Sequence, residues 1–183
     1  IGSRTPAKLA EYSKETGISA GTFAEVGRWG EALVLSVKGN AAERVLSLVG
    51  PELDGKVVID TTNPLTDAPP EQGVLHSFTG PNESLMERLQ LAWPMARFVK
   101  AFSCVGSARM VDPDFGGVRP TMFYCGDDAQ AKAIVARVLD QFGWETADMG
   151  GAVAARAIEP PAVLWCIPGF LQDSWTHAFK LLR

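Results

Sequence analysis

Short apolar runs alternate along this chain with stretches in which apolar residues recur every three or four positions. The runs are too short for helices and suit strands of a buried, mostly parallel sheet; they cover residues 32–37, 56–60, 96–102, 121–125 and 144–149. Helical periodicity predicts a helix over residues 6–16 and another from residue 154 onward, with an interruption near Pro168. It also predicts three helices whose apolar faces lie within residues 42–49, 85–93 and 131–142. This alternation is typical of an α/β fold.

Turn and cap residues mark where the elements begin and end. Candidate helix N-caps are Thr5, Asn40, Asn82 and Asp128, and candidate helix ends are Gly17, Gly50 and Gly143. The proline-rich stretch 64–81 predicts an irregular surface excursion between two elements.

Composition and charge narrow the class of protein. The 183 residues carry a formal net charge of −4, which argues against a nucleic-acid partner because phosphate binding needs a basic surface. The longest apolar run, residues 160–171, is too short and too interrupted by proline to span a bilayer. The cysteines at 104, 125 and 166 have no disulfide or metal-ligand spacing. We therefore expect a cytoplasmic protein with no metal site and no membrane partner.

Ligands of open α/β sheets bind beyond the carboxyl ends of the strands. Small or polar residues follow apolar runs at four such places, residues 2–4, 36–39, 60–64 and 103–106. The first segment suits the 2′-phosphate of NADP, because Ser3 can donate to a phosphate oxygen and Arg4 offers a planar fork of donors. Lys8 lies one helical turn further on and can add a charge. The alternative is a solvated loop that leads into a helix.

The other three segments hold few chemically active groups. Asn63 has an amide that could bond a ribose or a carboxamide, whereas Lys38 suits a phosphate or ribose or is merely solvated. Asp60 is expected to organise its loop by accepting nearby backbone amides. The only histidines are His76 and His177, and no nucleophile elbow supports a Ser–His–Asp arrangement. Hydride transfer needs no such group because the cofactor carries the chemistry, so no catalytic side chain is expected.

A dinucleotide-binding fold normally begins with a strand, a G-x-G-x-x-G loop and a helix. This sequence contains no such loop. We expect that roughly 25–30 residues are missing before Ile1, since a βαβ unit needs about 30, or that the domain is damaged. In the strand order 3-2-1-4-5-6 the missing strand is central, which predicts a gap within the sheet.

Six segments, taken in order, carry a family resemblance. They are residues 2–4 with Lys8, 57–64 (VVIDTTNP), 99–102 (VKAF), 124–128 (YCGDD), 155–160 (ARAIEP) and 178–182 (AFKLL). Together they resemble the NADPH-dependent reductases of the deazaflavin coenzyme F-420. The resemblance covers most of the chain, apart from the absent N-terminal phosphate-binding loop.

This resemblance implies a Rossmann-type doubly wound sheet in an N-terminally incomplete NADP-binding domain, residues 1–150, followed by a small helical segment, residues 151–183. It implies NADP(H) as cofactor and hydride exchange with a deazaflavin or a related flat acceptor. The implied cofactor-binding residues are Ser3, Arg4 and Lys8 at the 2′-phosphate, and Val37, Lys38, Asn63 and Ser103 beside the ribose and nicotinamide. Relatives of this family tend to carry Asn or His at position 103, so the shorter serine leaves the acceptor open.

Two functions from different classes remain open. The first is an NADP(H)-dependent oxidoreductase with a small-molecule redox acceptor, and the second is a non-catalytic NADP(H)-binding or redox-sensing module. An acceptor pocket lined by Gly150, Gly151 and the region of Trp165 would favour the enzyme. A homodimer is left open.

Overall fold

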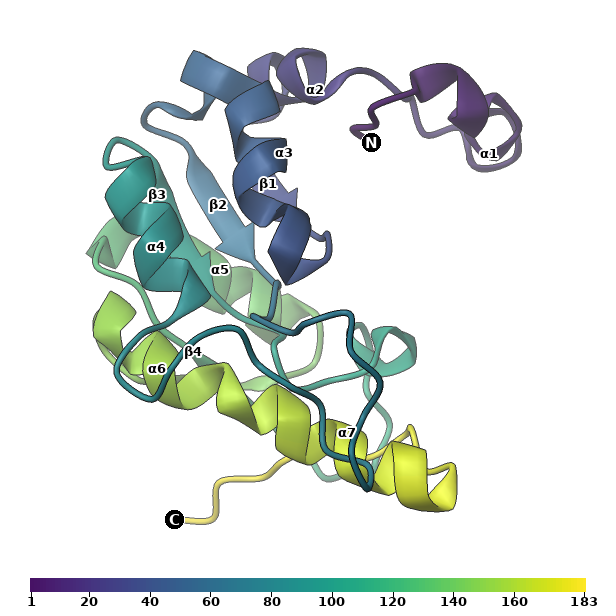
Figure 1. Cartoon of the computed structure of the whole chain (residues 1–183), viewed down its shortest axis with the longest axis vertical. Helices are drawn as coiled ribbons and strands as arrows, with labels where there is room; N and C mark the ends of the chain where they lie inside the picture. Colours follow the sequence, from purple (N-terminus) through teal and green to yellow (C-terminus); the bar gives the residue numbers. More distant parts are fainter.

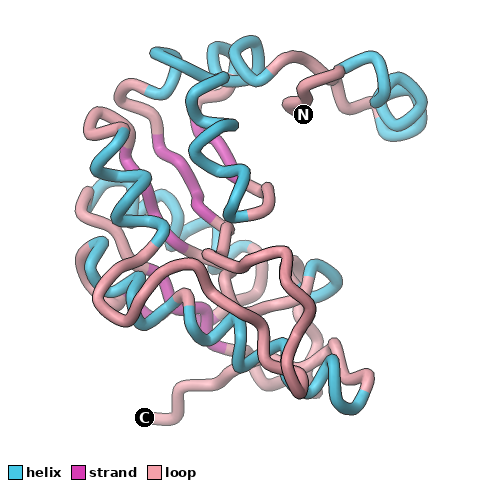
Figure 2. Tube along the Cα trace, viewed as in Figure 1, coloured by secondary structure: helices cyan, strands magenta, loops and turns pink.

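The computed structural model describes all residues 1–183 and contains two small parallel sheets flanked by helices (Figure 1, Figure 2). Strands β1 (Ala32–Leu35), β2 (Val57–Asp60) and β3 (Arg97–Lys100) form a three-stranded sheet in that order. Strands β4 (Thr121–Tyr124) and β5 (Glu145–Asp148) form the second sheet. An antiparallel bridge between Lys100 and Cys125 connects the two. All five predicted strands are therefore present.

The helices include every predicted one and one that the sequence analysis did not identify. They are α1 (Ala10–Thr16, after a 3-10 turn over Pro6–Leu9), α2 (Phe23–Trp29), α3 (Ala42–Val49), α4 (Leu85–Ala92), α5 (Ala129–Gln141), α6 (Ala155–Ile158) and α7 (Pro160–Gln172). The unpredicted helix, α2, begins with a capping box in which the Thr22 and Glu25 side chains accept from each other's backbone amides. Residues 64–81 form no helix or strand, as predicted.

Several predicted cap positions were wrong. Ser84, not Asn82, caps α4 by accepting from the amide of Glu87, because the helix begins two residues later than expected. Thr5 precedes a 3-10 turn but its side chain caps nothing. Asn40 lies inside a 3-10 turn and donates to Asp67 instead. Asp128 caps α5, as predicted.

The C-terminal part also differs from the expected pattern. Pro168 lies inside α7 without ending it, and residues 173–183 form no helix. The carbonyl of Phe179 instead accepts from the amide of Thr121, so this tail runs beside β4.

Both faces of β2 and β3 are buried, because alternate side chains of these strands enter different cores. Val58 and Phe98 join a cluster with residues of α3, α4 and α6, whereas Ile59 and Val99 join a cluster with residues of α5. Figure 1 shows α3 and α4 in front of these strands and α5 behind them. This arrangement is the predicted doubly wound α/β fold.

Strand β1 lies at the edge of the sheet, and part of it is exposed to solvent. The prediction of a buried strand over residues 32–37 was therefore wrong at this edge. Val34 is 63% exposed. Gly2 pairs in parallel with Gly21 in an isolated bridge that is not joined to β1. A cavity of about 450 Å³ lies between this bridge and β1, with Phe23 and Leu33 among its lining residues.

Substitutions on the two faces of α4 test the core. Leu89 is fully buried and Leu91 is 84% exposed on the same helix. Leu89→Ala is expected to lower the free energy of unfolding by about 2–5 kcal/mol, because it removes buried methyl groups and leaves a cavity. Leu91→Ala is expected to change it by less than about 0.5 kcal/mol. Denaturant unfolding measures both, and equal effects would contradict the described core.

Candidate nicotinamide-cofactor site

Three of the four predicted ligand-facing segments meet at the carboxyl ends of β1, β2 and β3. The side-chain amide of Asn63, after β2, donates to the backbone carbonyl of Ser103, after β3, at 2.9 Å. Gly39, after β1, packs so closely on Asn63 that a Cβ at this position would overlap the Asn63 carbonyl. The sheet therefore brings these segments into one site, as expected for strands that run parallel.

Two buried polar atoms in this site have no partner within the chain. They are the side-chain oxygen of Asn63 and the hydroxyl of Ser103, and Ser103 is only 5% exposed. Buried polar groups are nearly always hydrogen-bonded. An amide oxygen can accept and a hydroxyl can donate or accept. This pair therefore fits a ligand that has both donors and acceptors, such as the carboxamide of a nicotinamide ring.

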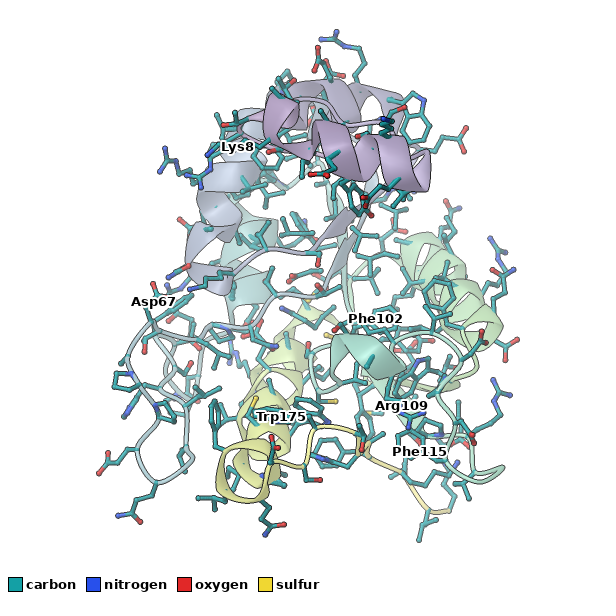
Figure 3. The ribbon with its side chains drawn as sticks, turned by 90° about the vertical axis from the view of Figure 1, so that its right-hand side faces the viewer. Lys8, Asp67, Phe102, Arg109, Phe115 and Trp175 are labelled. Atoms are coloured by element: carbon teal, nitrogen blue, oxygen red, sulfur yellow. The ribbon has the colours of Figure 1, made fainter.

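The backbone that leads to Ser103 is held in an unusual conformation. Phe102 has a φ of 60°, the left-handed region that a bulky residue rarely adopts. Its amide donates to the sulfur of Met122, and its ring packs against Phe142 with centroids 6.1 Å apart. Figure 3 shows Phe102 in the body of the molecule below the sheet. Strained residues of this kind concentrate at functional sites, where the surrounding packing holds them in place.

Asp60 organises its loop as predicted. One of its carboxylate oxygens accepts from the amide and the hydroxyl of Thr62, at 2.9 and 2.7 Å. The other oxygen lies 2.7 Å from the ammonium of Lys100, which also lies 2.9 Å from a carboxylate oxygen of Glu159. All three side chains are buried. Neither Lys100 nor Glu159 was predicted as a site residue. A lysine within the apolar run 96–102 is unusual, and this feature could have indicated Lys100.

Lys38 and Val37 lie at the end of β1, where Val37 is partly buried against the core. The ammonium of Lys38 is paired with Asp67 at 2.7 Å, and Asn40 donates to the same carboxylate. The hydrogen bond from Lys38 lowers the pKa of Asp67. These contacts attach the loop over residues 64–81 to the end of β1. The Lys38 ammonium, for which a phosphate or ribose contact was one prediction, is therefore paired with a carboxylate within the chain.

Ser3, Arg4 and Lys8 lie apart from this cluster. The Ser3 hydroxyl accepts from the amide of Thr5 at 3.1 Å, and the side chains of Arg4 and Lys8 are exposed and form none of the ion pairs. Figure 3 shows Lys8 near the top of the view, well separated from Phe102. Two separate groups of residues suit a ligand with two chemically different ends.

Trp165 and Gly150, which would line an acceptor pocket in an enzyme, each contact other parts of the chain. Trp165 packs against Gly106 and stacks on His177, with ring centroids 5.0 Å apart. Gly150 instead accepts from the amide of Gly126. Five cavities with volumes of about 140–730 Å³ are lined by neither Trp165 nor Gly150.

Cys104, next to Ser103, is also buried, and this burial raises the pKa of its thiol to about 11. The thiol is therefore protonated at neutral pH and is a poor nucleophile.

The chain is similar in sequence and in structure to known oxidoreductases. Residues 1–64 match the model of a family described as NADP oxidoreductase, coenzyme F420-dependent. Over the whole chain, the structure superposes on a protein from Arthrobacter sp. FB24 with a TM-score of 0.92, 29% identity and 87% of that chain covered. The assignment of that protein as an F420-dependent NADP reductase is itself an inference.

Two further proteins extend the comparison. The metalloreductase STEAP3 of Rattus norvegicus is 28% identical over 124 residues, which is 68% of this chain but 22% of that protein. The chain thus spans about a fifth of the length of this relative. The reductive aminase of Aspergillus terreus, solved with NADPH, superposes with a TM-score of 0.61 at 22% identity, covering 93% of this chain and 52% of that one. This last likeness shows the fold alone.

The chain is therefore similar to NADP-dependent oxidoreductases, and its fold is of the Rossmann type. The family that the sequence resembles, the coenzyme F-420-dependent NADP oxidoreductases, is also the one whose model matches residues 1–64, and the Arthrobacter structure is similar over the whole chain. None of the helices is long and apolar enough to cross a membrane.

Gly39 tests the close contact between the segments after β1 and β2. Gly39→Ala is expected to lower the free energy of unfolding by about 1–3 kcal/mol, because the new Cβ would press on the Asn63 carbonyl. Gly80→Ala is the control, since nothing lies within 4 Å of the added atom. Thermal unfolding compares the two variants, and a neutral Gly39→Ala variant would show that the loops are not packed together.

Proposed function

We propose that this protein binds NADP(H) and transfers a hydride between it and a deazaflavin or a related flat acceptor. The observation that carries the proposal is the pair of unpartnered buried atoms on Asn63 and Ser103, at the carboxyl ends of β2 and β3. The match of residues 1–64 to a family of NADP oxidoreductases supports the same cofactor. The relevant partner is then a small-molecule redox acceptor. A cytoplasmic location and a homodimer are part of the same proposal.

Each group of site residues has a separate task in this proposal. Ser3, Arg4 and Lys8 bind the 2′-phosphate, because a guanidinium fork and a nearby ammonium suit a phosphate dianion. Asn63 and Ser103 bind the carboxamide and so fix the orientation of the ring, while Val37 excludes water. When bound, NADPH supplies the hydride, and the acceptor takes two electrons with the hydride and any further proton from water. The protein contributes orientation and a dry site.

The alternative is a non-catalytic NADP(H)-binding or redox-sensing module. The packing of Trp165 against Gly106 and His177 favours it, because a flat acceptor needs space beside the nicotinamide. Reduction of any flat acceptor by the NADPH-bound protein would decide for the enzyme.

Arg4 tests the preference for NADP over NAD. Arg4→Ala is expected to weaken NADPH binding roughly 10- to 100-fold, because a hydrogen bond to a charged group contributes about 1.5–3 kcal/mol. NADH binding is expected to stay unchanged, since NADH has no 2′-phosphate. Lys14→Ala, which removes an exposed cation from α1, is the control. Titration calorimetry measures the affinities, and equal losses for both cofactors would contradict the assignment.

Asn63 tests the role of the site in hydride transfer. Asn63→Ala is expected to slow single-turnover oxidation of NADPH by a deazaflavin about 10- to 100-fold, because a small misplacement of reacting atoms is costly. Deuteration of the transferred hydrogen should give a primary isotope effect in both proteins. His76→Ala is the control and should leave the rate unchanged. If His76→Ala abolishes turnover in a folded protein, the proposed mechanism is wrong.

A further inference from the structure

Lys100 joins parts of the chain that are far apart in sequence. It is the last residue of β3 and is fully buried. Its ammonium lies 2.7 Å from the carboxylate of Asp60, at the end of β2, and 2.9 Å from that of Glu159, at the junction of α6 and α7. It also donates to the backbone carbonyl of Thr62 at 2.7 Å. The three protons of the ammonium thus face three oxygen atoms from two segments, the end of β2 and the α6–α7 junction.

Glu159 extends this cluster to a fourth element. Its two carboxylate oxygens accept from the backbone amides of Leu85 and Met86, at 2.9 and 3.0 Å, in the first turn of α4. These amides have no acceptor within the helix. A carboxylate near a helix N-terminus is also favoured by the helix dipole. The start of α7 is therefore tied to α4 and to the ends of β2 and β3 through one buried side chain.

The cluster fixes the peptide groups on both sides of Thr62. The amide and hydroxyl of Thr62 bond to Asp60, and its carbonyl bonds to Lys100. That carbonyl belongs to the peptide group whose nitrogen is that of Asn63. The backbone position of Asn63, and hence the direction of its side chain toward Ser103, follows from these bonds.

Stability alone does not account for such a cluster. Replacement of buried ion pairs by apolar residues of similar size is often neutral or stabilising, whereas removal of one partner is costly. Burial by itself lowers the pKa of Lys100, but Asp60 and Glu159 more than offset this effect and hold its pKa above the usual value. Lys100 therefore stays charged, and the cluster keeps a defined geometry.

We propose that Lys100, Asp60 and Glu159 form a buried positioning unit, through which the α6–α7 junction sets the placement of Asn63 in the cofactor site. The placement of Asn63 by this unit rests on the contacts alone. Its effect on cofactor binding rests on the proposed function. Glu159 is a positioning residue: it acts through Lys100 on the backbone of Thr62.

Glu159→Gln in the full chain tests this unit, because it removes the charge and keeps the size of the side chain. Hydrogen exchange of the backbone over residues 61–65, without any cofactor, is expected to become about tenfold faster, the factor for one lost hydrogen bond to a charged group. Exchange in β5, which forms no hydrogen bond or ion pair with the cluster, should stay unchanged. NADPH affinity should fall by a similar factor, whereas affinity for 2′,5′-ADP, which lacks the nicotinamide, should stay within about twofold.

Glu87→Gln is the matched control. Glu87 also links α4 to the C-terminal part, through an ion pair with Arg156 at 2.7 Å, but it does not contact the cluster. It should leave both exchange over residues 61–65 and NADPH affinity unchanged. If Glu159→Gln does not fold, Asp60→Asn provides the second variant, because it keeps an acceptor for Thr62 while removing the charge that faces Lys100.

The outcomes separate the two proposals. If exchange over residues 61–65 rises no more in Glu159→Gln than in Glu87→Gln, the positioning unit is refuted. If exchange rises but NADPH affinity does not fall, its effect on the cofactor is refuted. If the unmodified protein binds no NADPH while Glu159→Gln still speeds exchange, the proposed function fails and the structural part of the positioning unit stands.

Discussion

A buried ammonium group is costly unless charged partners surround it, and this constraint governs how the ends of the strands are arranged. Lys100 has no exposure to solvent. Removing such a charge from water costs several kcal/mol, which the fold offsets only by bringing two carboxylates and a carbonyl to it at 2.7–2.9 Å. These groups come from the end of β2 and from the α6–α7 junction, and Lys100 comes from the end of β3, so the cluster cannot form until all three parts are in place.

The candidate site depends on this arrangement and on a second constraint, the left-handed backbone of Phe102. The first places the backbone of Asn63, and the second turns the chain so that the Ser103 carbonyl meets the Asn63 amide. The atoms left without partners are then an amide oxygen and a hydroxyl. The exposed cations of Arg4 and Lys8 lie elsewhere, so the two ends of the site differ in polarity as the two ends of a dinucleotide do.

Hydrophobic patterning was sufficient to predict most of the fold. The strand over residues 56–60 and the helix after Asp128 follow directly from apolar spacing and a cap. Helix α2 was missed because it has only seven residues, one of them Gly27, and its capping box at Thr22 was overlooked. Caps at Asn82 and Asn40 were wrong because several polar residues precede each helix, and tertiary contacts decide which one caps it.

The site was predictable where it depends on strand ends and was not where it depends on contacts between distant residues. The carboxyl-end rule selected the segments around Asn63 and Ser103, which do meet. The pairing of Lys100 with Glu159 joins residues whose proximity no local pattern reveals. Likewise, no local pattern reveals that the tail after α7 packs Trp175 and His177 against Trp165.

The central claim is that one dinucleotide spans both groups of residues, and a crystal structure of the protein with NADP⁺ tests it most directly. The account predicts that the 2′-phosphate contacts Ser3 and Arg4, and that the carboxamide bonds to the side chains of Asn63 and Ser103. A cofactor bound on another surface, or bound with Asn63 and Ser103 untouched, would contradict it.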